Sequence, residues 1–226
     1  MIKKVLQYSI DNKLGHIPSA LSMLEYVEYL TQNILQKDWN IIIGKPFGSQ
    51  TYYKIWEKYW GLDITGLSYG VKHDEIPFVD YSEETLGNAL GIASGVQLAN
   101  NKKTWCNISD GALQMGPTLE AIQFIGKMKQ DILLTIDFNF MQLTGKTYDI
   151  IGIDEHNMYS YFHDFGWSIL LIDNDYSKIP KFINKKGPKC IIFRTKKGQG
   201  VLEMEQHPIK WHYKKLEDLD EITYSK

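Results

Sequence analysis

The sequence predicts an α/β fold with a mostly parallel sheet and helices on both faces. From residue 104 onward, apolar runs of strand length alternate with stretches whose apolar residues recur at helical spacing. That alternation is typical of parallel βαβ units. The chain has 226 residues, of which 43% are hydrophobic, enough to bury a substantial core. No Ser- or Pro-rich linker divides it, so we expect residues 1–226 to form one domain, with a C-terminal tail from about residue 213.

Helix signals dominate the first hundred residues. Pro18 stands just before one amphipathic stretch and Gly61 closes another, as expected at helix starts and ends. We predict helices at residues 19–36, 52–60 and 85–100. Residues 38–82 are rich in aromatic side chains and look irregular around the second helix, so we expect loops there that line a site.

Strands and helices alternate in the rest of the chain. Strands are predicted at residues 104–109, 131–138, 168–172 and 190–195, and helices at residues 117–129, 157–165 and 175–185. Cys106 and Cys190 fall inside two of these strands, where a free thiol behaves as a small buried hydrophobe. We therefore expect no disulfide.

Charge and hydropathy exclude several classes of function. The net charge is −2, and neither sign clusters beyond short runs, so no nucleic acid or anionic membrane partner is expected. No stretch approaches the roughly 18 apolar residues that a membrane span needs, and the N-terminus lacks the pattern of a secretory signal. A cytoplasmic protein is predicted.

Polar residues follow two of the predicted strands at the point where each ends. Asp110 and Gly111 come directly after the strand at 104–109, and Asn139 follows the strand at 131–138. A βαβ unit takes roughly 30 residues, so these strands can be neighbours and their oxygen-bearing side chains can converge. A carboxylate and an amide oxygen suit Mg²⁺, and glycine lets a diphosphate approach the backbone. The alternative is that Asp110 and Gly111 form only a turn and a helix cap, with Asn139 an ordinary loop residue.

Four segments resemble transketolases in the same order along the chain. "SDGALQMGPTLEA...TIDFNFMQLTGK" is similar to the thiamine diphosphate motif of that family. "GHIPSALSMLEYVEYL" resembles the opening Gly-His helix, "HDEIPFVDYSEETLGNALGIASGVQLA" the substrate-site histidine with its glycine-rich helix, and "TKKGQGVLEMEQHPIKWH" the closing histidine segment. The resemblance implies the thiamine diphosphate-binding fold.

The resemblance also implies an incomplete enzyme. Transketolases join a diphosphate-binding domain to a pyrimidine-binding domain, and the cofactor lies between domains of different subunits. This chain matches the diphosphate-binding domain alone, so it is similar to the N-terminal subunit of a split transketolase. The expected partner is a C-terminal transketolase-like subunit that carries the pyrimidine-binding domain and the activating glutamate. An α2β2 heterotetramer is expected, and the chain alone should be inactive.

The family's functional residues map onto this sequence as expectations. Asp110, the Asn139 side chain and the Met141 backbone carbonyl would bind Mg²⁺. Gly111 and Ser109 would lie against the diphosphate and Leu86 against the cofactor rings. His16, His73 and His212 would contact the cofactor or a sugar or sugar-phosphate substrate. With a pKa near its ordinary value, a histidine could move protons near neutral pH. Glu120 would act across the subunit interface. The alternative for each histidine is a structural role, and for Glu120 a favourable charge in the first turn of a helix.

Four positions depart from the family pattern. Ser109 stands where the family usually has glycine, and Met115 stands where it has the first glutamate of the interface. Glu84 stands where the family has a glycine whose carbonyl faces the aminopyrimidine, and Pro46 stands where it has a histidine. Strain at Ser109 of about 1 to 3 kcal/mol would weaken a cofactor site by about tenfold to a few hundredfold. Met115 would alter the coupling between the two active sites. Pro46 would alter the choice of substrate.

Three functions therefore remain open at the level of sequence. The first is a transketolase-like transferase that moves a two-carbon ketol unit from a ketose to an aldehyde, with thiamine diphosphate and Mg²⁺ as cofactors. The second is another thiamine diphosphate chemistry, in the style of deoxyxylulose phosphate synthase, which forms an acyloin from a keto acid. The closing segment at residues 195–212 favours the first. The third is a non-catalytic interaction subunit that has lost the cofactor, which the four departures favour.

Overall fold

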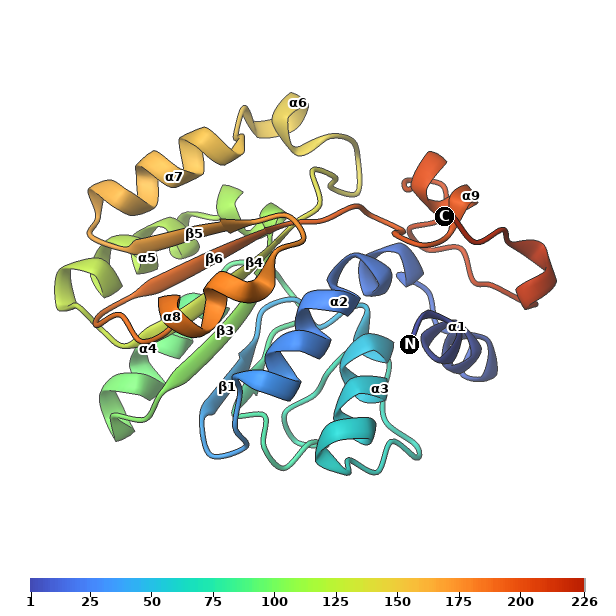
Figure 1. The fold of residues 1–226 in the computed structure, drawn as a ribbon, viewed down its shortest axis with the longest axis horizontal. Helices are drawn as coiled ribbons and strands as arrows, with labels where there is room; N and C mark the ends of the chain where they lie inside the picture. The colour runs from blue at the N-terminus through green and yellow to red at the C-terminus, as the bar shows by residue number, and fades with distance from the viewer. Residues whose placement is uncertain (226) are drawn as a thin grey trace.

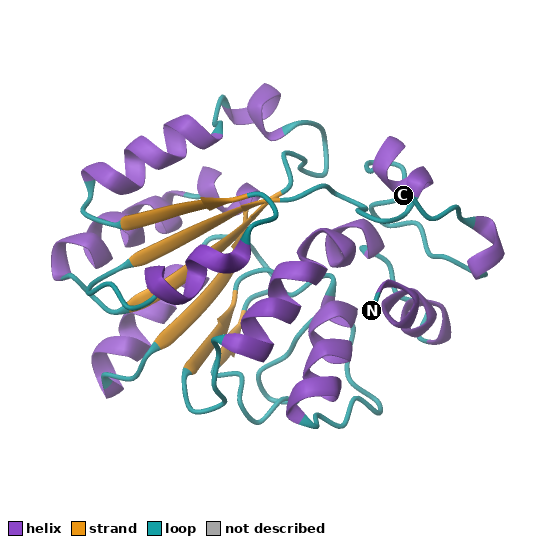
Figure 2. Ribbon diagram, viewed as in Figure 1, coloured by secondary structure: helices purple, strands orange, loops and turns teal. Residues whose placement is uncertain are grey.

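A six-stranded, entirely parallel sheet forms the centre of the computed structural model, which describes residues 1–225. Figure 2 shows the strands side by side between layers of helices. The strand order is β2-β1-β3-β4-β6-β5. The bounds are β1 Asn40–Ile43, β2 Tyr81–Ser82, β3 Thr104–Ser109, β4 Ile132–Phe138, β5 Ser168–Ile172 and β6 Lys189–Arg194. The predicted α/β class with a parallel sheet is confirmed.

Helices cover both faces of the sheet, as the alternating pattern predicted (Figure 1). Helices α4, α5 and α7 pack on one face, and α1, α2, α3, α8 and α9 contribute to the core on the other. Their bounds are α1 Ile2–Asp11, α2 Ile17–Asn33, α3 Ser49–Trp60, α4 Ala89–Asn100, α5 Gly116–Met128, α6 Thr147–Ile151, α7 Glu155–Asp164, α8 Ile179–Phe182 and α9 Leu202–Gln206. Short 3-10 turns η1 Asp110–Gln114, η2 Tyr176–Lys178 and η3 Leu219–Glu221 complete the elements.

The two faces of the sheet contribute side chains to two separate hydrophobic clusters. Along β3, Trp105 packs in the cluster with α2 and α3, whereas Cys106 and Ile108 pack in the cluster with α4 and α5. Successive side chains of a strand point to opposite faces, so a strand that is buried on both sides is apolar throughout. Cys106 and Cys190 are both buried free thiols, as predicted.

The register of the sheet brings the ends of β3 and β4 together. Ser109 pairs with Asp137, and Phe138 pairs with Arg194 of the next strand. Because all the strands are parallel, the loops that follow β1, β3, β4 and β6 leave the same edge of the sheet. That edge is where ligands collect in open α/β sheets.

The structure contains elements that the sequence did not predict. Helix α1 occupies residues 2–11, and strands β1 and β2 lie inside the section expected to be irregular. β1 is only four residues long, but it is fully buried and pairs with β3 in the middle of the sheet. Its run of three isoleucines is too short to show a strand periodicity, so the sequence did not predict this strand.

The C-terminal segment returns to the N-terminal helices (Figure 1). The backbone N–H of His16 donates to the carbonyl of His212 at 3.0 Å, and that of Gly198 donates to Pro18 at 2.9 Å. Leu216 is buried in the core cluster with α1 and α2, and Val201 forms a bridge with Tyr224. Among residues 1–225 no helix combines the length and apolar character of a membrane span.

Candidate functional site

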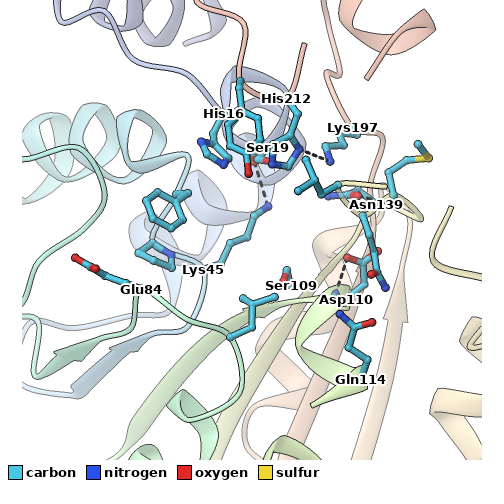
Figure 3. A pocket seen from close by; sticks show the side chains of 18 residues that line it. His16, Ser19, Lys45, Glu84, Ser109, Asp110, Gln114, Asn139, Lys197 and His212 are labelled. Atoms are coloured by element: carbon cyan, nitrogen blue, oxygen red, sulfur yellow. Dashed lines mark hydrogen bonds between the residues drawn. The ribbon is translucent and has the colours of Figure 1, made fainter. Parts of the chain in front are cut away.

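The carboxyl ends of β3 and β4 open into a cavity of about 400 Å³. Asp110 and Asn139, the residues that follow these strands, both line it (Figure 3). The prediction that the two strands are neighbours and that these side chains converge is confirmed by the register of the sheet. Opposite them the wall comes from α2, the loop after β1 and the C-terminal segment, which Figure 3 shows meeting over the cavity.

Most of the predicted site residues line this cavity. They are His16, Leu86, Ser109, Asp110, Gly111, Asn139, Met141 and His212. Two others do not. His73 is exposed and stacks on Tyr81, with ring centroids 5.9 Å apart, and Glu120 is exposed on α5. The structure therefore does not bring His73 or Glu120 to the cavity, and their roles stay predictions.

Asp110 is a buried carboxylate at the first position of η1. Its Oδ1 accepts the N–H of Gly111 at 2.9 Å and its Oδ2 accepts the hydroxyl of Thr147 at 2.9 Å. Burial, with a smaller contribution from the charge of Asp137, raises the pKa of Asp110 to about 7. A buried carboxylate with two neutral donors is thus poorly compensated, and a nearby cation would stabilise its charge.

Asn139 has its amide fixed at both ends. Its Nδ2 donates to Oδ2 of Asp137 at 3.1 Å, and its Oδ1 accepts the N–H of Met141 at 3.1 Å. Backbone bonds hold the turn that follows, from Thr147 N–H to Phe140 O at 2.9 Å and from Gln142 N–H to Gly145 O at 2.8 Å. The predicted ligand atoms of Asn139 and Met141 therefore sit on a defined turn.

The donor set fits a hard divalent cation. One carboxylate, one amide oxygen and one backbone carbonyl are oxygen ligands of the kind that Mg²⁺ takes together with phosphate oxygens and water. A Cβ added at Gly111 would meet Leu86 and Ser109 only at ordinary contact distances of 3.4 and 3.7 Å. Packing around residue 111 therefore does not require glycine. The backbone without a side chain leaves room for an anion. Among the side chains that the structure describes, no group of three His, Cys, Asp or Glu residues could hold a metal.

Two buried lysines at the cavity were not predicted. Lys45 follows β1, forms an ion pair with Asp137, and donates to the carbonyl of Ser19 at 3.1 Å. Lys197 follows β6 and is 4% exposed. Burial first, and then the charge of Lys45, lowers the pKa of Lys197 to about 8. Two buried lysines that line one cavity suit a polyanionic ligand.

His16 and His212 meet edge to face, with ring centroids 4.6 Å apart. His16 stacks on Phe47 and its Nδ1 hydrogen-bonds the hydroxyl of Tyr69. Burial, with the charge of Lys197, lowers the pKa of His16 to about 4 and that of His212 to about 3. The expectation of ordinary histidine pKa values is wrong here, because low-dielectric surroundings and lysine neighbours oppose the imidazolium form. Both rings are neutral near pH 7.

The four departures differ in their structural effect. Ser109 has φ −93° and ψ 164°, which is ordinary extended backbone, so serine causes no backbone strain at this position. Pro46 and Glu84 line the cavity, where each can alter what binds. Met115 directly precedes α5, and its side chain lies beside Gly87.

Comparisons with known proteins point to one group of enzymes. Residues 68–156 match the family model of the N-terminal part of 1-deoxy-D-xylulose-5-phosphate synthase. The 1-deoxy-D-xylulose-5-phosphate synthase of Blochmanniella floridana is 29% identical, over 93% of this chain and 41% of that protein. An uncharacterised transketolase family protein of Sinorhizobium fredii is 32% identical, over 65% of this chain and 56% of that protein. The chain thus spans 41% and 56% of the length of these two relatives.

Solved structures agree on the fold. The transketolase from Leishmania mexicana superposes with a TM-score of 0.72 at 16% identity, over 89% of this chain and 37% of that one. The transketolase from Campylobacter jejuni gives 0.69 at 20% identity, over 92% of this chain and 38% of that one. The chain has the α/β fold of these transketolases, and its residues 68–156 are similar in sequence to the N-terminal part of 1-deoxy-D-xylulose-5-phosphate synthase.

Proposed function

We propose that residues 1–226 form one diphosphate-binding domain that holds thiamine diphosphate through Mg²⁺ and acts in a two-chain transketolase-like enzyme. The observation that carries the proposal is the convergence of Asp110 and Asn139 with Lys45 and Lys197 around one cavity. Oxygen donors on one wall suit the cation, and ammonium groups on the other suit the phosphates.

Each residue has a distinct task in this proposal. Asp110, Asn139 and the carbonyl of Met141 hold Mg²⁺, Gly111 and Ser109 lie along the diphosphate, and Leu86 packs on the cofactor. His16 and His212, being neutral, hydrogen-bond oxygen atoms of a sugar or sugar-phosphate substrate. When bound, thiamine diphosphate supplies the nucleophilic carbon that breaks and forms a carbon–carbon bond beside a carbonyl.

The proposed partner is a chain with a pyrimidine-binding domain, in an α2β2 assembly. One observation supports it. Large apolar side chains are exposed around the cavity rim, among them Leu86, Leu143 and Tyr213. Exposed apolar area beside a ligand site is typical of an interaction surface.

The test is calorimetric titration of thiamine diphosphate into the complex of this chain with its partner, with and without Mg²⁺. We expect Mg²⁺-dependent binding that Asp110→Ala abolishes. Asp149→Ala, which removes an exposed carboxylate on α6 outside the cavity, is the matched control and should bind normally. Equal binding by Asp110→Ala would overturn the metal assignment. A folded complex that binds no cofactor would favour the non-catalytic interaction subunit.

A second candidate is chemistry of the deoxyxylulose phosphate synthase type. The family model over residues 68–156 and the Blochmanniella relative favour it. The two chemistries differ in their donor, because a keto acid loses carbon dioxide when it gives its fragment and a ketose does not. Release of carbon dioxide from a 2-keto acid in the presence of an aldehyde would select the second candidate. Transfer from a ketose without gas release would select the first.

A further inference from the structure

Asp137 is a carboxylate inside the buried strand β4, two residues before Asn139. It is fully buried and pairs in the sheet with Ser109, so it lies directly beneath the cavity. Apart from its negative charge, which acts on Asp110, the proposed function gives Asp137 no task.

Groups from four segments hold the Asp137 carboxylate. Its Oδ2 accepts the Ser22 hydroxyl of α2 at 2.6 Å and Nδ2 of Asn139 at 3.1 Å, and it pairs with Lys45 from the loop after β1. Its Oδ1 accepts the hydroxyl of Thr195, which follows β6. A carboxylate with donors on both oxygens has one orientation available.

This arrangement determines which way the amide of Asn139 faces. An ionised carboxylate can only accept hydrogen bonds, so the amide nitrogen must face Asp137. A flipped amide would set its oxygen against the carboxylate and its N–H₂ group against the N–H of Met141. The contacts at both ends therefore assign Oδ1 to the side away from Asp137, where it accepts the Met141 N–H and keeps a second lone pair.

We propose that Asp137 is a positioning residue that fixes the Asn139 amide with its oxygen toward the cation site. Lys45, Ser22 and Thr195 hold Asp137 in place for that purpose. The inference rests on the proposed function, in which the Asn139 oxygen binds Mg²⁺. Groups that orient a metal ligand typically change metal affinity by about 10- to 100-fold when they are removed.

The test compares two double variants that both lack the buried ion pair. Lys45→Met/Asp137→Asn keeps an acceptor for Asn139, because the new amide can turn its oxygen toward Nδ2 and donate to the Thr195 hydroxyl. Lys45→Met/Asp137→Leu has a similar volume and no acceptor. Replacing both partners of a buried pair by neutral groups avoids a stranded charge, so both chains should fold. Any contribution of Lys45 to ligand binding is lost equally from both.

Two measurements on the full chain with its partner separate the outcomes. Mg²⁺-dependent affinity for thiamine diphosphate should be about 10- to 100-fold weaker in the Asp137→Leu double than in the Asp137→Asn double. The ¹⁵N-correlated side-chain signals of Asn139, recorded without cofactor, should shift in the Leu double and stay near the unsubstituted position in the Asn double. Equal affinities, or unmoved Asn139 signals in the Leu double, would overturn the inference. Failure of the unsubstituted complex to bind the cofactor would instead count against the proposed function, and the Asn139 signals would still test the orientation.

Discussion

The ammonium group of Lys197 lies 3.1 Å from Nδ1 of His212 at the wall of the cavity. An ammonium group can only donate, so Nδ1 of His212 accepts and carries no hydrogen. The proton of the neutral ring is then on Nε2. His212 is therefore a neutral donor with a defined tautomer, and Lys197 sets that tautomer.

Replacing Lys197 should raise the pKa of His212. The pKa of His212 is lowered to about 3 by burial and then by the charge of Lys197. Lys197→Met removes that charge, so the pKa of His212 should rise toward its ordinary value. An NMR titration of the His212 ring measures it. Lys196→Met, which removes an exposed lysine paired with Glu205, should leave the His212 titration unchanged. An unmoved His212 in Lys197→Met would contradict the coupling.

Anion binding should weaken as the pH rises through the pKa of Lys197. Burial and Lys45 lower that pKa to about 8, so Lys197 is largely protonated near pH 7 and largely neutral near pH 9. If the anion requires the protonated form, affinity for inorganic pyrophosphate should fall about tenfold across this window. Calorimetry on the chain and on Lys197→Met measures it, and the variant corrects for titration of the ligand. The same slope in both proteins would show that Lys197 does not contact the anion.

The negative charge of Asp110 should lower the free energy of unfolding of the cofactor-free chain. Burial and Asp137 raise its pKa from 3.8 to about 7, so the folded state binds the proton more tightly than the unfolded state. This contribution to stability is present below about pH 4 and is lost as the pH rises through about pH 7. Asp110→Asn should therefore raise the free energy of unfolding by about 2 to 4 kcal/mol near pH 8 and by little near pH 4. Urea denaturation at both pH values tests this, and a pH-independent difference would contradict it.

Breaking the buried ion pair from one side should destabilise the fold. Lys45→Met leaves the Asp137 carboxylate buried without its cation, which typically costs about 3 kcal/mol or more. Lys45→Met/Asp137→Asn should recover much of that loss. The comparison pair is Lys58 and Glu28, partly exposed and 2.9 Å apart, for which Lys58→Met should cost much less, because solvent screens an exposed pair. Equal losses for the two lysine variants in urea denaturation would show that Asp137 does not depend on Lys45.

The sequence predicted those strands of the sheet whose apolar runs are long enough to recognise. The strand at 104–109 matches β3 in both bounds, and the strand at 131–138 differs from β4 by one residue. Asp110 and Asn139 were found because ligand sites in parallel sheets follow strand ends, a rule that needs only the order of elements.

Burial of charge could not be predicted in the same way. Lys45 and Lys197 follow strands, as exposed loop residues commonly do, and only the fold shows that α2 and the C-terminal segment cover them. A signal existed for Asp137, because a carboxylate inside the apolar run "DILLTIDF" must find partners. Those partners, Ser22 and Lys45, lie about a hundred residues away in sequence.

The hydrogen bond from the His16 N–H to the His212 carbonyl ties one wall of the cavity to a residue made very late in the chain. During synthesis the sheet can assemble once β6 has emerged, but Lys197 and His212 must still leave the ribosome and find α2. A nascent chain can therefore hold Asp110 and Asn139 in place opposite α2 and the loop after β1 alone. Lys197 and His212 complete that wall only after residue 212 has been translated.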